Sequence, residues 1–213
     1  MTRSRFPDAP PEIARLPVEA RGYPVPHFVS WVDGAPEFRA VDSRKIAETD
    51  RRRVCWICGG KLGGVLCFAI GPMCIVNRVA PEPPSHLSCC RFAVTACPFL
   101  SKPMAKRRPM ERGSYAPAPG IMIERNPGVI ALWQTRTYRS ERDLGHGGLL
   151  FRIGSPLRVE WWAEGRAATR AEVMESIRTG IPRLSEIAEL DGPEAVNMLR
   201  DHLARALRWV PAS

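Results

Sequence analysis

Residues 55–60 read Cys-Trp-Ile-Cys-Gly-Gly, and residues 83–90 read Pro-Pro-Ser-His-Leu-Ser-Cys-Cys. All seven cysteines of the 213-residue chain fall between Cys55 and Cys97. A Cys-x-x-Cys pair followed by His-x-x-Cys is a spacing typical of zinc ligands, because cysteines two residues apart can direct both sulfurs at one tetrahedral ion. The sequence therefore predicts one zinc ion, bound by Cys55, Cys58, His86 and Cys89.

The residues around these ligands indicate a knuckle, a hairpin and a helix. Gly59 supplies the backbone freedom that a tight knuckle needs. Residues 61–70 read as a small hairpin with a glycine turn, followed by a Gly-Pro stop. Two prolines and Ser85 then indicate a helix start, with Ser85 as the N-cap. His86 and Cys89 share one face of the first turn, where the positive helix end favours a thiolate.

This order of knuckle, hairpin and ligand-bearing helix resembles the treble-clef class of zinc fingers over residues 55–97. The resemblance implies a metal that holds the local fold together. Cys74 and Cys90 are the substitutes that we expect if one ligand is misassigned. Cysteines that are simply buried and bind no metal are the competing interpretation.

The formal net charge of +9 is unevenly distributed along the chain. Residues 1–113 hold 18 Lys and Arg against 10 Asp and Glu, whereas residues 114–213 hold 13 against 12. Two basic clusters flank the cysteine-rich stretch, and such clusters suit contacts with phosphate groups. A solvated basic surface without a partner is the alternative interpretation. The candidate nucleic-acid-binding residues are Arg51, Arg52, Arg53, Lys106, Arg107 and Arg108.

The composition is that of a soluble globular protein, with 45% hydrophobic and 25% charged residues. No run approaches the roughly 18 apolar residues of a membrane span, and residues 1–7 lack the apolar segment of a signal peptide. We therefore expect a cytoplasmic protein without a membrane partner. The reducing cytoplasm favours a metal site over disulfides, and the odd number of cysteines agrees with this.

Shifts in composition predict four parts of the chain. The first holds a proline-rich arm, a hairpin over residues 27–41 and a short helix capped by Asp42 and Ser43. Residues 101–120 contain four prolines and a basic cluster, which is typical of a linker. The parts are the arm, hairpin and helix in 1–53, a zinc-binding treble-clef-like module in 54–100, a basic proline-rich linker in 101–120 and an α/β domain in 121–213.

The second half reads as strands followed by helices. Residues 136–148 have the composition of a polar loop. Thr169 and Glu172 form a capping box that starts a helix, which we expect to end at Gly180. An apolar stripe of period 3.6 marks the last helix, from Asp191 onward, and we expect this stripe to pack on the sheet. The expected strands are 129–135, 149–153 and 157–163, and the expected helix between the other two is 182–190.

The fold class that follows is α+β: a small zinc-stabilised, treble-clef-like N-terminal half, then an antiparallel sheet with C-terminal helices. Residues 71–84 read as a long loop with polar groups of its own. Loops of this kind carry function or pad an irregular fold, and padding is the competing interpretation here. The possible pocket residues in this loop are Cys74, Asn77, Arg78 and Glu82.

Five short motifs stand out: Cys55-Trp-Ile-Cys58-Gly, Gly71-Pro-Met-Cys74, Asn77-Arg78, Glu82-Pro-Pro-Ser-His86 and Ala96-Cys97-Pro98-Phe99. They resemble an uncharacterised family of bacterial and phage-encoded proteins with a treble-clef-like CxxCG…HxxC zinc site. The resemblance extends to residues 161–177. That family implies no activity, so the resemblance supports the division of the chain and adds no function. Such proteins have alanine where Cys90 stands, which favours Cys89 as the ligand.

Three functions fit these observations. The first is a non-catalytic binding module with a structural zinc that contacts nucleic acid or a nucleoprotein through the basic clusters. The second is an adaptor that binds another protein, which explains the near-neutral second half better. The third is a zinc-dependent enzyme, for which we identify no catalytic residue. Four good ligands leave no open position on the ion, and residues 59–70 lack the histidine that a His-Asn-His nuclease needs as its general base.

Overall fold

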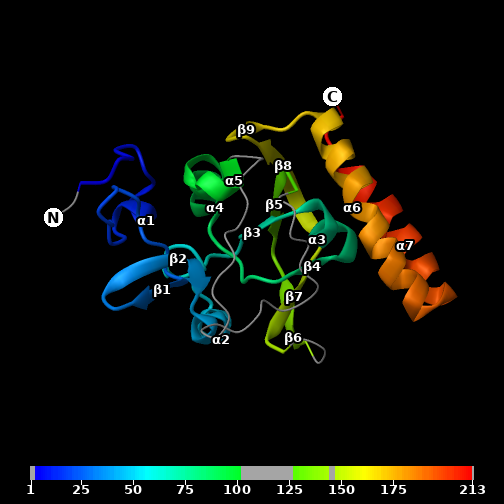
Figure 1. Cartoon of the computed structure of the whole chain (residues 1–213), viewed down its shortest axis with the longest axis horizontal. Coiled ribbons are helices and arrows are strands. Elements are labelled where there is room, and N and C mark those ends of the chain that lie inside the picture. The colour runs from blue at the N-terminus through cyan, green and yellow to red at the C-terminus, as the bar shows by residue number, and fades with distance from the viewer. Residues whose placement is uncertain (1–2, 102–126, 144–146, 213) are drawn as a thin grey trace.

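The structure is a computed structural model, and it describes residues 3–101, 127–143 and 147–212. Figure 1 shows a central body of strands and helices, with the N-terminal part on one side and a long helical hairpin on the other. The sheets are antiparallel and the chain ends in helices. The α+β class expected from the sequence is therefore confirmed.

A four-stranded sheet forms the centre of the body. Its second strand is buried along its whole length, because its side chains alternate between two packed faces. Ala131 and Trp133 of that strand belong to one apolar core, and Ile130 and Leu132 belong to the other. In spatial order the strands are β3 (Leu66–Ile70), β5 (Ile130–Thr135), β8 (Pro156–Ala163) and β9 (Arg166–Ala167).

Helices cover both faces of this sheet (Figure 1). Burial of apolar side chains between the sheet and the helices is the main stabilising contribution here. One face carries α4 (Leu87–Ala96), which continues into α5 (Pro98–Ser101). The other face carries α3 (Pro72–Asn77), α6 (Arg170–Asp191) and α7 (Pro193–Ala206), followed by the 3-10 turn η1 (Leu207–Trp209).

Strand β3 connects the two halves of the sequence, because all five of its residues pair with β5. On its other edge, Cys67 forms a bridge with Ser85. The hairpin expected over residues 61–70 is therefore wrong, since only 66–70 is a strand and Lys61 bridges Val54 instead. The apolar run of β3 is buried on both faces, and an isolated two-stranded hairpin could not bury it.

Two segments expected to be loops contain regular structure. Residues 71–84 include α3 and the short strand β4, and Pro72 starts α3 at a position where its missing N–H would have no partner in any case. Residues 136–148 include a half-exposed strand, and its polar side chains are the reason why the sequence predicted a loop there. A second sheet results, with the order β4 (Val79–Ala80), β7 (Leu149–Ile153) and β6 (Tyr138–Arg142).

Helix α6 continues through Pro182 to Asp191, so the expected end at Gly180 and the separate helix over 182–190 are wrong. Gly180 is buried, and a Cβ atom there would lie 2.8 Å from Sδ of Met73 in α3. The glycine therefore allows two helices to approach closely and does not end one. The last expected helix is confirmed as α7, whose apolar stripe packs against α6 and α3 as well as the core.

The N-terminal part contains α1 (Pro11–Ala14), a hairpin of β1 (Val29–Val32) and β2 (Ala35–Val41), and α2 (Ser43–Arg52). The hairpin and α2 confirm the expectation, and the Asp42 side chain caps α2 by accepting a hydrogen bond from the Arg44 N–H at 3.2 Å. The proline-rich arm includes only the four-residue helix α1, and it lies on the core, where it buries Ile13 on the α4 face.

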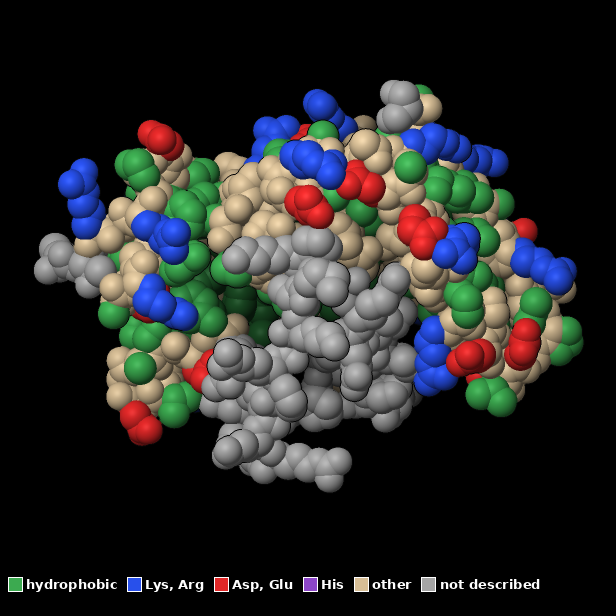
Figure 2. Space-filling view, turned by 45° about the horizontal axis from the view of Figure 1, so that its top comes forward, with side chains coloured by type: hydrophobic (Ala, Val, Ile, Leu, Met, Phe, Trp, Pro, Cys, Tyr) green, Lys and Arg blue, Asp and Glu red, His purple; other side chains and the backbone are tan. Residues whose placement is uncertain are grey.

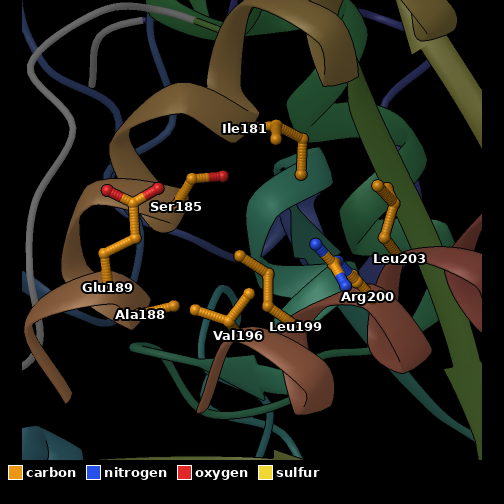
Figure 3. Close-up of a pocket in the computed structure, with 8 residues that line it drawn as sticks. All are labelled: Ile181, Ser185, Ala188, Glu189, Val196, Leu199, Arg200 and Leu203. Atoms are coloured by element: carbon orange, nitrogen blue, oxygen red, sulfur yellow. The ribbon is translucent and has the colours of Figure 1, made fainter. Parts of the chain in front are cut away.

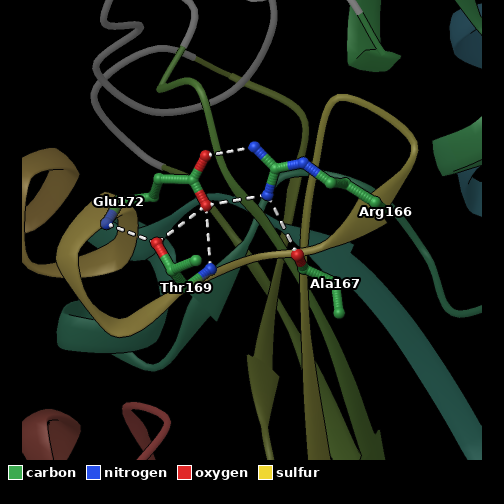
Figure 4. A network of polar contacts seen from close by, with 4 residues as sticks. All are labelled: Arg166, Ala167, Thr169 and Glu172. Carbon is green, nitrogen blue, oxygen red and sulfur yellow. Dashed lines mark hydrogen bonds and ion pairs between the residues drawn. The ribbon is translucent and has the colours of Figure 1, made fainter. Parts of the chain in front are cut away.

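The start of α6 is held by the expected capping box, which is confirmed (Figure 4). The Thr169 hydroxyl accepts a hydrogen bond from the Glu172 N–H at 3.3 Å, and the Glu172 carboxylate accepts one from the Thr169 N–H at 2.8 Å. Arg166, in the strand before the helix, donates to the same carboxylate at 2.6 Å. This guanidinium lowers the pKa of Glu172 from 4.5 to about 2.

Replacing Glu172 with glutamine should lower the free energy of unfolding by about 1 kcal/mol at pH 7, because one arm of the capping box and a partly exposed ion pair are weakened. The folded-state pKa is depressed, so the ionic contribution is present above pH 4.5 and is lost as the pH falls towards 2. Denaturant unfolding of both proteins between pH 7 and pH 2.5 checks this. If the difference in the free energy of unfolding between the two proteins is as large at pH 2.5 as at pH 7, the ionic role is contradicted. Glu186→Gln, which changes an exposed pair with Arg183, is the control.

A cut in the chain between residues 101 and 127 should leave the two fragments associated. β3 pairs with β5 across this interval, and Arg91 of α4 pairs with Glu160 of β8 at 2.6 Å. A specific protease site inserted there, cleaved and followed by gel filtration, checks this expectation. Fragments that separate without denaturant would support the independent halves predicted from the sequence. The boundary predicted at 101–120 itself lies, beyond Ser101, outside the described residues.

Candidate metal centre

Three cysteines and one histidine converge beside the central sheet, on the α4 face. The ligand atoms of Cys55, Cys58, His86 and Cys89 all lie within 4.8 Å of one another. Nδ1 of His86 is 3.3 Å from Sγ of Cys58 and 3.7 Å from Sγ of Cys89. Bonds of about 2.3 Å to sulfur around a tetrahedral ion place neighbouring sulfurs about 3.8 Å apart. The cluster therefore has dimensions that can hold one metal ion.

The first two ligands sit in a tight turn that directly follows α2. The Cys55 N–H donates to the Gly60 carbonyl at 2.7 Å, and the Gly59 N–H donates to the Cys55 carbonyl at 2.8 Å. Gly59 has φ of +72°, and a Cβ atom there would lie 3.0 Å from Nδ1 of His27. The turn thus requires glycine for its backbone conformation and for the imidazole packed against it.

Backbone N–H groups surround the sulfur atoms. The Cys58 and His86 N–H groups both point at Sγ of Cys55, each at 3.4 Å, and the Gly60 N–H points at Sγ of Cys58 at the same distance. Hydrogen bonds from the side chains of Cys58 and Cys89 lower the pKa of Cys55, and the Cys55 sulfur in turn raises the pKa of the other two. All three thiols would be deprotonated together only with a cation between them, because the thiolate is the form of cysteine that binds a metal.

His86 is oriented for metal binding by its second ring nitrogen. Nε2 lies 2.9 Å from the Lys61 carbonyl oxygen, which can only accept, so Nε2 carries the hydrogen and Nδ1 is left as the acceptor facing the sulfurs. A backbone carbonyl behind a ligand histidine is the usual arrangement in metal sites.

The helix start differs from the expectation by one residue. His86, not Ser85, is the N-cap of α4, because Ser85 is held in two backbone hydrogen bonds with Cys67, at 2.8 and 2.9 Å. The third residue of α4 is Cys89, so the helix supplies one ligand from its first turn and one from its cap. The extended backbone of His86 places its N–H 3.4 Å from Sγ of Cys55.

The two substitute ligands lie elsewhere. Cys90 is buried, with its thiol directed at the Cys67 carbonyl at 3.7 Å. Cys74 lies in α3 on the opposite face of the sheet, where burial raises its pKa to about 11. Among the described residues, the four-residue cluster contains neither of them.

The cluster is partly embedded, with Cys58 and His86 half-buried. Cys55 and Cys89 are fully buried, and both belong to the core that includes Leu132 of β5. Trp56, between the first two ligands, stacks on Phe28 with ring centroids 5.1 Å apart. Four donors of this kind can complete a tetrahedral coordination sphere around one ion, an arrangement typical of structural zinc sites.

The basic residues expected to contact nucleic acid are only partly within the described residues. Arg51, Arg52 and Arg53 lie at the end of α2 and are exposed. Arg52 is paired with Glu48, and the guanidinium of Arg53 lies 5.5 Å from the centre of the Tyr138 ring. Lys106, Arg107 and Arg108 lie outside the described residues. On the face in Figure 2, Lys and Arg side chains are dispersed, with Asp and Glu side chains beside several of them.

The four possible pocket residues occupy different places around α3. Cys74 packs against the core, and the charge of Glu82 contributes to its raised pKa. Asn77 ends α3, and Arg78 turns back to β7, where it donates to the Ile153 carbonyl.

Two features of the cluster were not predicted from the sequence: the Lys61 carbonyl behind His86, and the packing of His27 on the knuckle. Neither feature has a signature in ligand spacing.

No helix in the described parts of the chain has the length and apolar character to cross a bilayer.

Comparisons of the sequence with protein-family models and curated proteins, and of the chain with solved structures, found no match. The family resemblance noted from the motifs stays a prediction, and the metal-ligand cluster rests on its own geometry.

The cluster should bind one divalent metal ion per chain. Replacing Cys89 with serine should remove most of the bound metal and lower the thermal midpoint, because the buried thiolates lose their cation. Cys97→Ser is the matched control, since Cys97 caps the end of α4 and lies outside the cluster. Elemental analysis and thermal unfolding measure both effects. Full metal content in Cys89→Ser, or equal loss in Cys97→Ser, would show that the ligand set is wrong.

Proposed function

We propose that the protein is a non-catalytic binding module in which a structural zinc ion, held by Cys55, Cys58, His86 and Cys89, fixes α4 and the end of α2. The observation that carries this proposal is the set of three sulfur donors and one imidazole, with a carbonyl behind the histidine. Zinc suits three thiolates and one imidazole in tetrahedral geometry, whereas magnesium and calcium prefer oxygen ligands. A closed coordination sphere favours a structural role over an enzymatic one.

We further propose that the module contacts nucleic acid or a nucleoprotein through the arginines that end α2. The knuckle begins two residues after Arg53, so the metal site sets where the end of α2 lies. Arg51 is exposed and makes no ion pair with another described residue, which leaves its guanidinium available to a phosphate. The net charge of +9 and the second basic cluster, at Lys106, Arg107 and Arg108, support this proposal.

A protein adaptor is the second candidate, and the helical hairpin favours it. Between α6 and α7 lies a groove of about 220 Å³, which Figure 3 shows with apolar side chains from both helices and with Glu189 and Arg200 at its sides. Near the tip of the hairpin, Leu190 is 88% exposed and Met198 is 55% exposed. Large apolar side chains at this exposure suit a contact with another protein.

The salt dependence of binding separates the two candidates. Replacing Arg51 and Arg52 with alanine should flatten the slope of log affinity for a short DNA duplex against log salt by roughly 1.8, at about 0.9 per phosphate contact. The matched control replaces Arg178 and Arg183, two exposed arginines of α6 that, like Arg52, pair with glutamates. Equal slopes for the wild type and the two double variants would exclude phosphate contacts at α2. If binding by the wild type does not depend on salt, the adaptor is the remaining candidate function.

A further inference from the structure

The groove between α6 and α7 is lined by apolar side chains that the chain itself buries only in part. Ile181 of α6 and Leu199 and Leu203 of α7 pack against the core on the face of the sheet that carries α3, yet each is only half-buried. Ser185 and Ala188 of α6 are too small to fill the remaining space, and a groove of about 220 Å³ results (Figure 3). Removing such apolar surface from water is favourable, so the groove suits an occupant.

Two charges of opposite sign flank the groove, one from each helix (Figure 3). Glu189 of α6 and Arg200 of α7 are exposed, and neither makes an ion pair with another described residue. Other charged side chains of the helical hairpin are paired within their own helix: Arg178 with Glu175, Arg183 with Glu186 and Arg205 with Asp201. The groove is therefore flanked by an acid and a base that are both available to an occupant.

The charge of the helical hairpin narrows the class of partner. Residues 170–206 hold five arginines against seven Asp and Glu, a net charge of −2, whereas the whole chain carries +9. Such an element offers no electrostatic attraction to a nucleic acid or to an anionic membrane surface. A groove flanked by one acid and one base is instead complementary to a copy of itself, because a two-fold axis can place the acid of each copy opposite the base of the other.

The helical hairpin also has the place and the length that pairing with a second copy requires. Figure 1 shows it at one edge of the body, on the opposite side from the N-terminal part. Helix α6 has 22 residues and α7 has 14, so the two helices run side by side for about 20 Å. Two antiparallel helix pairs that each expose an apolar groove can pack on each other as a four-helix bundle.

We propose that this groove is the interface of a two-fold symmetric dimer, in which the helical hairpins of two copies form a four-helix bundle. Glu189 of each copy pairs with Arg200 of the other, and the half-buried apolar side chains of the groove become buried. This inference rests on the second candidate function, the binding of a protein at the helical hairpin, and it identifies that protein as a second copy of the chain.

Sedimentation equilibrium of the zinc-loaded full chain over a wide range of concentrations measures the dissociation constant of the dimer. Glu189→Arg and Arg200→Glu each place like charges opposite each other twice, so each should weaken the dimer at least about tenfold. The double variant that combines Glu189→Arg with Arg200→Glu exchanges the two charges and should restore the wild-type dissociation constant. Both residues are exposed, so all three variants should fold, which metal content and the thermal midpoint check.

Glu186→Arg is the matched control, because Glu186 is an exposed acid of α6 that pairs with Arg183 and does not line the groove. This variant should dimerise as wild type does. A wild type that stays monomeric at every concentration would overturn the inference and leave the groove to a different protein. A dimer that tolerates both single reversals, or that the exchange of charges does not restore, would also overturn it, since the interface would lie elsewhere.

The dimer is independent of the nucleic-acid contact proposed at the end of α2. Replacing Arg51 and Arg52 with alanine should leave the dissociation constant of the dimer unchanged, because both arginines lie in α2 and outside the helical hairpin. Failure of this interface and failure of the contact at α2 are therefore separate results.

Discussion

The pairing of β3 with β5 is the constraint on which the remaining structure depends. It brings residues 66–70 against residues 131–135, and the resulting sheet has two faces that other elements cover. One face receives α4 and the cysteine cluster, and the other receives α3, α6 and α7. Because β5 is buried on both faces, both apolar cores include residues of this one strand.

The interaction of Glu160 shows how the cluster side is tied to the sheet. This carboxylate in β8 accepts hydrogen bonds from Arg91 of α4 and from Gln134 of β5. Arg91 lowers the pKa of Glu160, so the pair stays ionised at neutral pH. The helix that carries Cys89 is therefore held at its first turn by the cluster and further along by a bidentate ion pair.

The proximity of Cys55, Cys58, His86 and Cys89 could be predicted from sequence because their spacing is distinctive and is a local property of the chain. The capping box at Thr169 and the helix cap at Asp42 were predictable for the same reason. The partner of β3 could not be predicted, since strand pairing depends on residues more than 60 positions away. Gly180 was read as a helix end because its use in packing against Met73 exists only in the folded protein.

The hydrogen bond between His86 and the Lys61 carbonyl joins the exit of the knuckle to the cap of α4. An ion in the cluster would close a loop between residues 58 and 86 that contains β3, α3 and β4. For a covalent link closing about 30 residues, the loss of chain entropy in the unfolded state corresponds to about 3 to 4 kcal/mol. With an ion bound, the cluster would act as a reversible link on the segment that enters the central sheet. Chelation would open this link without breaking a covalent bond, and the folded state would lose the free energy of metal binding.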